Sequence, residues 1–268
     1  MFDLTQRSLG RAADLWLLDE SAVDGLSAAL SVETLLSPEE LARYTRLRRA
    51  GVRRRFLGGR LLCRHALSAY ADVAPAAWTF AAGRFGRPEL EPNPHGLTFN
   101  LSHTEGLIAC VITRGAACGV DVENVPARPE AVALADGHFA RRERVALANA
   151  GDDRARADRF VDFWVLKESY TKALGVGLSR RMSTFGFDLG PPAVTVTDEE
   201  RDPGERRDWQ FELLRIGPRH ACGVAVRRVG CDGQLLQLRT IDFVSAIGRR
   251  DPRRAPLAVT LRHADVMA

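Results

Sequence analysis

Two apolar stretches in separate halves of the chain resemble each other, and they constrain its fold more than any other feature. Residues 106–112 read Gly-Leu-Ile-Ala-Cys-Val-Ile, and residues 220–226 read His-Ala-Cys-Gly-Val-Ala-Val. Runs of this kind are typical of buried strands. In each half the expected elements follow the order helix, helix, strand, strand, strand. A chain that repeats its order of elements is expected to fold as two similar units.

The expected elements define these two units. In the first half they are a helix that starts at residue 37, a helix over 53–70, and strands over 97–102, 107–113 and 119–123. In the second half they are helices that start at 139 and span 160–174, and strands over 185–189, 210–214 and 220–226. Pro126 and Pro129 interrupt the pattern between the halves. We therefore expect an α+β fold of two similar lobes related by pseudo-two-fold symmetry, residues 1–123 and 124–244, followed by a loose Arg-rich tail, residues 245–268.

The charges are nearly balanced, but their distribution is uneven. The 268 residues carry a net charge of +4, which is too small for a dedicated nucleic-acid-binding protein. Between Glu40 and Asp72 there is no acidic residue, whereas nine arginines lie from Arg43 to Arg64. Such a block is either an anion site for phosphates or an acidic partner, or a solubilising face with crude affinity for nucleic acid.

The sequence contains no signal for export or for insertion into a membrane. The N-terminus lacks a basic segment followed by an apolar one, and no apolar run approaches the roughly 18 residues of a membrane span. The five cysteines are an odd number without a Cys-x-x-Cys pair, so reduced thiols are expected rather than zinc ligands or disulfides. We expect a cytoplasmic protein that binds neither membrane nor nucleic acid.

The chain has only two lysines, Lys167 and Lys172, against 36 arginines. Both lysines lie on the same expected helix. A chain so rich in arginine could have used it here too, so the compact ammonium is expected to matter at these positions. The alternative is that two lysines remain by chance on a solvated helix face.

Four charged residues suggest a metal and phosphate site. Asp121 and Glu123 are two apart on a strand, so both carboxylates leave the same face, where they repel each other unless a cation neutralises them. Oxygen ligands favour a hard ion such as Mg²⁺. Glu168 and Lys172 are one helical turn apart, which would let Glu168 complete a metal site while Lys172 meets a phosphate. Each pattern is also common on exposed sheet and helix faces.

Polar residues end the strand at 97–102. Asn100, Ser102 and His103 could all reach a ligand from there. His103 is either neutral in a hydrogen-bonded corner or cationic beside a phosphate.

Three separated motifs together resemble the signatures of the 4′-phosphopantetheinyl transferases. They are FNLSH at residues 99–103, GVDVE at 119–123 and WVLKESYTKALGVG at 164–177. LGGR at 57–60, FGRP at 85–88 and the Phe139-x-x-x-Glu143 spacing fit secondary features of the family. The size and the two-lobe plan are similar to the surfactin-synthetase-type branch, which is a pseudo-dimer in one chain. The resemblance covers most of residues 37–226.

The resemblance implies transfer of the phosphopantetheine arm of coenzyme A to a serine of an acyl or peptidyl carrier protein, with 3′,5′-ADP as the other product. It implies that Asp121, Glu123 and Glu168 hold Mg²⁺ and that Lys172 and His103 contact phosphate oxygens. The base for the carrier serine would be Glu168 or a Mg²⁺-bound water held near Glu123, and the sequence does not choose between them. The residues implied around the nucleotide and its 3′-phosphate are Arg55 with Arg43 or Arg49, and Arg87, Pro88, Asn100 and Ser102.

The same resemblance implies a monomer and an acidic carrier protein as partner, because carriers are acidic around their modified serine. Fatty-acid, polyketide and nonribosomal-peptide carriers all remain candidates, and the broad range of this branch favours secondary metabolism. Two rival hypotheses stay open: a non-catalytic module of the same fold that binds coenzyme A or a carrier, and an Arg-rich nucleic-acid-binding protein.

Overall fold

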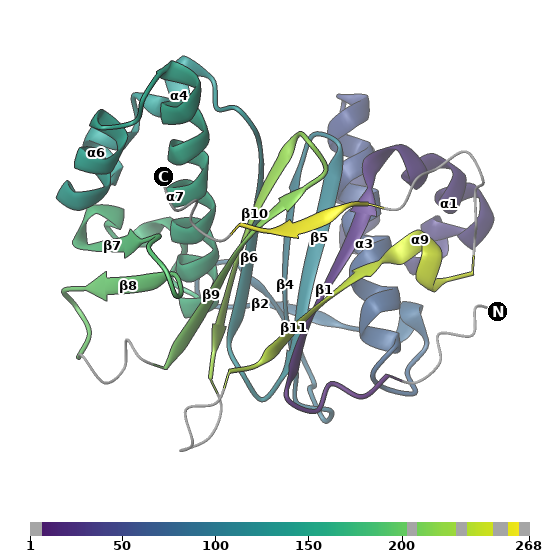
Figure 1. Ribbon diagram of the computed structural model, residues 1–268. Coiled ribbons are helices and arrows are strands. Elements are labelled where there is room, and N and C mark those ends of the chain that lie inside the picture. Colours follow the sequence, from purple (N-terminus) through teal and green to yellow (C-terminus); the bar gives the residue numbers. More distant parts are fainter. Residues whose placement is uncertain (1–6, 203–207, 229–234, 249–256, 263–268) are drawn as a thin grey trace.

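Two four-stranded sheets lie side by side in the middle of the molecule, and helices cover the outer side of each (Figure 1). The computed structural model describes residues 7–202, 208–228, 235–248 and 257–262, without the side chains of Val32, Glu33 and Leu178. The first sheet has the strand order β11 (Gln237–Asp242), β1 (Ala12–Asp19), β5 (Leu107–Arg114), β4 (Leu97–Thr104). The second has the order β12 (Val259–Leu261), β9 (Trp209–Ile216), β10 (His220–Arg227), β6 (Cys118–Asn124).

Three apolar cores hold these layers together. One packs the first sheet against α3 (Ala50–Ser68), a second packs the other sheet against α7 (Asp153–Leu174), and a third fills the space between the sheets. β5 is covered on both faces, which explains why its sequence is a continuous apolar run rather than an alternation. The further helices are α1 (Val23–Leu30), α2 (Pro38–Arg46), α4 (Pro129–Val132), α5 (Ala135–His138), α6 (Arg141–Ala148) and α9 (Phe243–Ala246), with 3₁₀ turns at Glu20–Ala22, Val32–Leu35, Pro75–Ala77, Gly177–Ser179 and Met182–Thr184.

Helix α7 lies unusually close to the second sheet because two glycines face it. A Cβ atom on Gly119 of β6 would lie 2.0 Å from Ser169 O, and one on Gly223 of β10 would lie 2.4 Å from Val165 O. Only glycine permits such a close approach of helix to strand.

Both ends of α7 are capped. The side chain of Asp152, just before the helix, accepts a hydrogen bond from Ala155 N, and Gly175 follows the helix with φ +71°.

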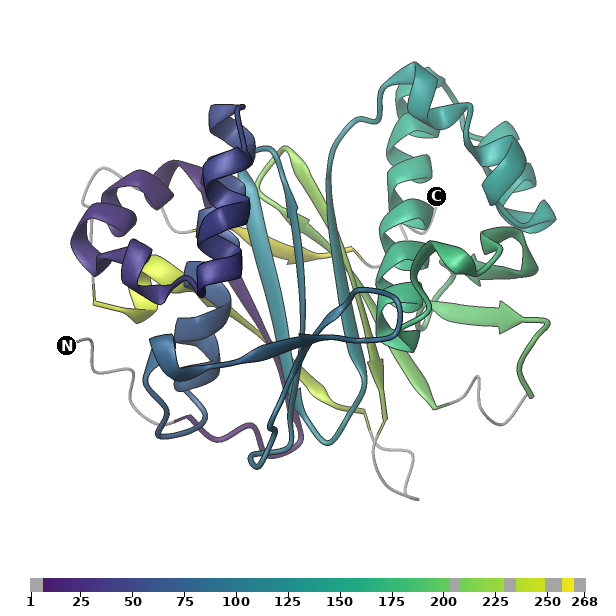
Figure 2. The ribbon, with the colours of Figure 1, turned by 180° about the vertical axis from the view of Figure 1, so that it is seen from behind.

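Two short hairpins extend from the lobes. They are formed by β2 (Phe80–Ala82) with β3 (Pro88–Leu90), and by β7 (Phe185–Asp188) with β8 (Thr195–Asp198). The β2–β3 hairpin leaves the first lobe and crosses the sheets toward the second lobe (Figure 2). Its Arg87 Nη1 donates to Lys172 O at the end of α7, at 2.7 Å. The hairpin therefore joins the two lobes.

The α+β architecture is the expected one, and the motif-bearing strands and helices lie within a few residues of their expected positions. Three features differ. β1 and its parallel partner β11 were not expected, although they complete the first sheet. β6 pairs with β10, and β11 returns to β1, so the sheets do not follow the expected lobe limits at 123 and 244.

The third difference concerns the segment expected to be a loose tail. Within it α9 ends at Ala246 and β12 pairs with β9, while residues 249–256 and 263–268 lie outside the described part. Arg262 after β12 is ion-paired with the buried Asp162 of α7, which fastens this segment to the second lobe. None of the described helices has the length and apolar character needed to cross a membrane.

Candidate active site between the two sheets

Strands β4 and β6 adjoin where the two sheets meet, and a side chain joins them. Asn100 Oδ1 of β4 accepts a hydrogen bond from Val120 N of β6 at 2.9 Å. Val120 and Val122 lie in the core between the sheets, so Asp121 and Glu123 leave β6 on the other face, which α7 covers. Asn100 therefore fixes the edge of the strand that carries both carboxylates.

The Lys172 ammonium joins α7 to both strands. Its Nζ donates to Asp121 Oδ1 at 2.6 Å, to Ser102 Oγ at 3.1 Å and to Val120 O at 3.2 Å. Ser102 Oγ in turn donates to Asp121 Oδ1 at 2.9 Å. An ammonium has three donors that can diverge toward three acceptors, whereas a guanidinium is a planar fork. The geometry explains why lysine stands here in a chain of arginines.

The second oxygen of Asp121 is left without a partner. Asp121 Oδ2 is buried and accepts no hydrogen bond within the part of the chain that the structure describes. An unpaired buried carboxylate oxygen costs roughly 1–3 kcal/mol or more. A group that donates to this oxygen or coordinates it would recover that free energy.

Two further carboxylates lie close to Asp121. Burial raises the pKa of Glu123 to about 7, the Asp121 anion and Glu168 add to the rise, and Lys172 opposes it. Burial also raises the pKa of Glu168, with Asp121 adding to the rise and Lys172 opposing it. Among the described residues no three His, Cys, Asp or Glu side chains converge into a metal cluster. Asp121 is ion-paired with Lys172. The three acids are thus electrostatic neighbours that do not share one point.

The candidate phosphate-binding arginines differ in how they are held. Arg43 and Arg49 are exposed, and the Arg43 guanidinium lies over the Phe56 ring. Arg55 Nη1 is ion-paired with Glu20 at 3.0 Å. The Arg87 guanidinium donates to Lys172 O and to Phe99 O, so it ties the end of α7 to β4 instead of pointing freely into a pocket.

Pro88 and His103 border the site from the first lobe. Pro88 and Arg87 line a cavity of 270 Å³ together with Phe99. His103 lies at the surface, where loss of hydration lowers the pKa of its ring and the cations Arg55 and Lys172 lower it further. Charges from both lobes therefore act on this ring.

Lys167 serves a different purpose from Lys172, although the two are close in sequence. Its ammonium is fully buried and donates to Glu143 Oε2 at 2.8 Å, Met182 O at 2.8 Å and Phe185 O at 2.6 Å. Glu143 also accepts from Phe187 N and Ala140 N, each at 2.9 Å. The spacing of Phe139 and Glu143 was noted in the sequence, but nothing there indicated that Glu143 pairs with Lys167.

A cavity of 430 Å³ opens beside Glu123 and was not foreseen. Its wall includes Trp164 and Phe160 of α7, and Thr104 and Asn124 from the ends of β4 and β6. Trp164 is one helical turn before Glu168, and this spacing was the only signal in the sequence for the aromatic wall. An apolar cavity next to charged groups suits a ligand with an apolar part and an anionic part.

Comparison with known proteins identifies the family of the chain. Residues 117–225, which include β6, α7 and most of β10, match the family described as the 4′-phosphopantetheinyl transferase superfamily. The chain is 33% identical to the 4′-phosphopantetheinyl transferase HetI of Nostoc sp., over 79% of this chain and 83% of that protein. It is 27% identical to the mouse L-aminoadipate-semialdehyde dehydrogenase-phosphopantetheinyl transferase, over 72% and 67% of the two chains, and 32% identical to the Eremothecium gossypii protein of that name, over 77% and 72%. The chain belongs to the 4′-phosphopantetheinyl transferase superfamily.

Proposed function

We propose that this protein transfers the 4′-phosphopantetheine arm of coenzyme A to a serine of an apo acyl or peptidyl carrier protein, giving the holo carrier and 3′,5′-ADP. The observation that carries the proposal is the junction of Lys172 and Asp121, where a cation lies beside a buried carboxylate oxygen without a partner. Phosphoryl transfer requires little covalent chemistry from the protein. It requires charge stabilisation and positioning, which such a junction supplies.

The residues at this junction have the chemistry to hold a divalent cation once Asp121 is released from Lys172, and we propose Mg²⁺. Asp121, Glu123 and Glu168 would hold it. Asp121 Oδ2 is buried without a hydrogen bond, and the pKa values of Glu123 and Glu168 are raised, so all three groups would gain from a nearby positive charge. When bound, Mg²⁺ would neutralise charge on the pyrophosphate of coenzyme A.

In the proposed reaction the carrier serine Oγ attacks the phosphorus that bears the pantetheine arm. The bond from that phosphorus to the bridging oxygen breaks, and 3′,5′-ADP leaves with the electron pair. The serine proton would pass to Glu168, or to a water held near Glu123. Lys172 contacts a phosphate oxygen and holds the leaving group in line.

The rest of coenzyme A would lie along the first lobe. His103 would donate to a phosphate oxygen, and Arg55 with Arg43 or Arg49 would meet the 3′-phosphate. Arg87 is held by two carbonyl groups, so it would border the nucleotide with its stem and backbone. The residues proposed to line the nucleotide pocket are Arg87, Pro88, Asn100 and Ser102.

The carrier protein would be acidic, because α2 and the start of α3 present a cluster of exposed arginines. This cluster comprises Arg43, Arg46, Arg48, Arg49 and Arg53. A basic surface speeds encounter with an acidic partner and makes the rate sensitive to salt. Both lobes of one chain supply the site, so we propose that the protein acts as a monomer, in the cytoplasm.

Intact-mass spectrometry of an apo carrier tests the proposal. The carrier is incubated with the protein, coenzyme A and Mg²⁺, and a gain of about 340 Da, the mass of the arm, is expected. EDTA should abolish the gain, and Asp121→Asn should reduce it severely. If fatty-acid, polyketide and peptide carriers all stay unmodified while coenzyme A still binds, the protein is a non-catalytic binding module.

A further inference from the structure

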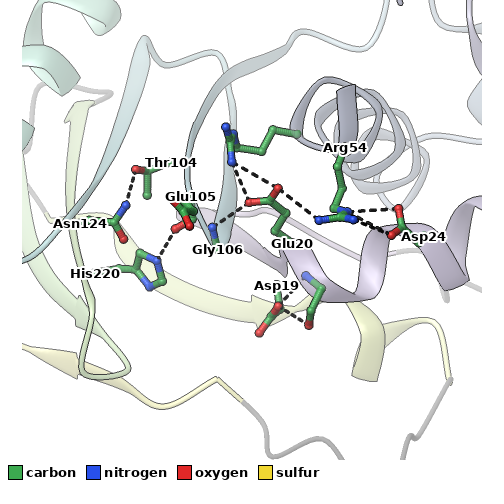
Figure 3. Close-up of polar contacts among 11 residues, drawn as sticks. Asp19, Glu20, Asp24, Arg54, Thr104, Glu105, Gly106, Asn124 and His220 are labelled. Carbon is green, nitrogen blue, oxygen red and sulfur yellow. Dashed lines mark hydrogen bonds and ion pairs between the residues drawn. The ribbon is translucent and has the colours of Figure 1, made fainter. Parts of the chain in front are cut away.

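One carboxylate, Glu20, connects two parts of the first lobe that face the proposed coenzyme A site. It follows β1, and its side chain is only 7% exposed. One oxygen accepts from Arg55 Nη1 of α3 at 3.0 Å and from Gly106 N at 2.8 Å. Gly106 lies in the turn between β4 and β5, as Figure 3 shows. Glu20 thereby joins the helix that carries Arg55 to the turn that follows His103.

Arg55 differs from its neighbour Arg54 in how much of its guanidinium is used. Arg54 donates from Nε to Asp24, its Nη2 lies 2.9 Å from Asp24, and its Nη1 lies 4.0 Å from Glu20 Oε1, so its whole fork is occupied (Figure 3). Arg55 uses Nη1 alone, and within the described residues its other nitrogens have no hydrogen-bond partner. Glu20 therefore binds Arg55 through Nη1 only, and the other guanidinium nitrogens, Nη2 and Nε, remain available to an anion.

The turn on the other side of Glu20 is also held by the second lobe. His220 Nε2 lies 3.0 Å from Glu105 O, and Asn124 Nδ2 donates to Thr104 Oγ1 at 2.9 Å. These contacts come from β10 and β6, as Figure 3 shows. The turn is thus fixed from both lobes, and through Glu20 its position also fixes that of Arg55.

Besides the loss of hydration, the charges of Arg55 and Lys172 each lower the pKa of the His103 ring. Arg55 comes from α3 of the first lobe and Lys172 from α7 of the second. A ligand with several phosphates needs such donors at fixed separations.

We propose that Glu20 is a positioning residue that orients Arg55 toward a phosphate group of the substrate and keeps it in register with His103. This inference rests on the proposed function, because it takes coenzyme A as the substrate. Glu20 does not touch the substrate. It acts by holding Arg55 in place. The alternative role, in which the negative charge of Glu20 repels anionic ligands, is not the one proposed.

The test compares coenzyme A with 3′-dephospho-coenzyme A in wild type, Glu20→Gln, Glu20→Asp and Arg55→Met. Gln has the shape but not the charge, whereas Asp has the charge but is too short to hold both partners. Both Glu20 variants are expected to raise KM for coenzyme A by about five- to tenfold and to leave KM for the dephospho form nearly unchanged. In the Arg55→Met background the Glu20→Gln change should have no further effect.

Asp24→Asn is the matched control, because it makes the same change at the exposed Arg54 pair and should leave both KM values unchanged. Tighter binding of coenzyme A by Glu20→Gln, or wild-type selectivity in Glu20→Asp, would show that charge rather than position matters and would overturn the inference. So would an equal loss with both substrates, or a Glu20→Gln effect that persists without Arg55. Calorimetric Kd values for the two ligands give the same comparison without a carrier, so a missing transfer reaction would refute the proposed function alone.

Discussion

Lys172 Nζ lies 2.6 Å from Asp121 Oδ1, and this ion pair spans the boundary between α7 and the strands of both sheets. The ammonium also reaches Ser102 and Val120 O, so three acceptors from two strands surround it. A bound phosphate oxygen and a cation at Asp121 would have to replace part of this arrangement.

Lys172→Arg should lower kcat by about tenfold to a hundredfold, because a planar fork cannot meet three diverging acceptors without moving the phosphate. Steady-state transfer to a carrier protein measures the rate, and circular dichroism verifies the fold. Arg144→Lys, an exposed substitution on α6, serves as the control and should have no effect. An unchanged kcat in Lys172→Arg would contradict the argument from the compact ammonium.

Glu143→Gln or Lys167→Met should each destabilise the protein by about 3–5 kcal/mol, since each leaves an uncompensated charge in a fully buried pair. Urea unfolding measures the loss. The double variant Glu143→Leu, Lys167→Met should recover much of the free energy, because replacing both members of a buried pair by apolar groups is often neutral. A double variant as unstable as the single ones would mean that the carbonyl contacts of Lys167 dominate.

Much of the fold was predictable because it rests on local signals. Apolar runs and a long helical segment indicated the strands and α7, and the two-residue spacing placed Asp121 and Glu123 on one face. β1 and β11 were not predicted because β1 is stabilised by pairing with strands that are distant in sequence. Its Trp16 lies opposite Cys110 of β5 and Ile241 of β11. Pairings over such distances leave no periodic trace.

The site was predictable in its residue types but not in its connections. The motifs pointed to Lys172, Asp121 and the two glutamates, and the structure brings these four residues close together. The Glu20–Arg55 pair and the Arg87 contact with Lys172 O join segments whose neighbourhood depends on the whole fold. Long side chains such as arginine can reach several partners, so sequence spacing alone does not select one.

Gly119→Ala should destabilise the protein and reduce transfer, because the new Cβ would lie 2.0 Å from Ser169 O and force α7 away from β6. The helix carries Glu168 and Lys172, so a shift displaces both. Thermal unfolding and kcat are the measurements. Gly137→Ala is the matched control, since its Cβ would meet no atom within 4 Å. Native stability in Gly119→Ala would show that the helix can move without cost.

Glu123→Gln should raise the Tm of the metal-free protein at pH 8, by about 2–4 °C for each kcal/mol gained. The folded-state pKa of Glu123 is about 7 against an ordinary 4.5, so the folded state binds this proton more tightly. The stabilisation is complete below pH 4.5 and is lost as pH rises to 7, above which the ionised group opposes folding. Gln lacks that penalty, and its advantage should therefore vanish at pH 4.5.

Mg²⁺ provides the control for this experiment. At pH 8 it should raise the Tm of the wild type, because it neutralises the ionised acids, and it should raise that of Glu123→Gln much less. Scans in EDTA and in Mg²⁺ at both pH values separate the two effects. A variant that is less stable than the wild type at pH 8 without metal would show that the Glu123 anion is favoured in the fold.

Strand β11 pairs in parallel with β1, so the first sheet contains a strand that the ribosome makes long after the other three. During synthesis the edge of β1 that pairs with β11 has no partner strand while α7 and β10 are being made. The same holds for the buried Asp14, whose Oδ1 lies 2.5 Å from Arg239 Nε of β11 in the folded protein. The first sheet is therefore completed only when residues 237–242 have been made, and until then this edge of β1 has no strand partner.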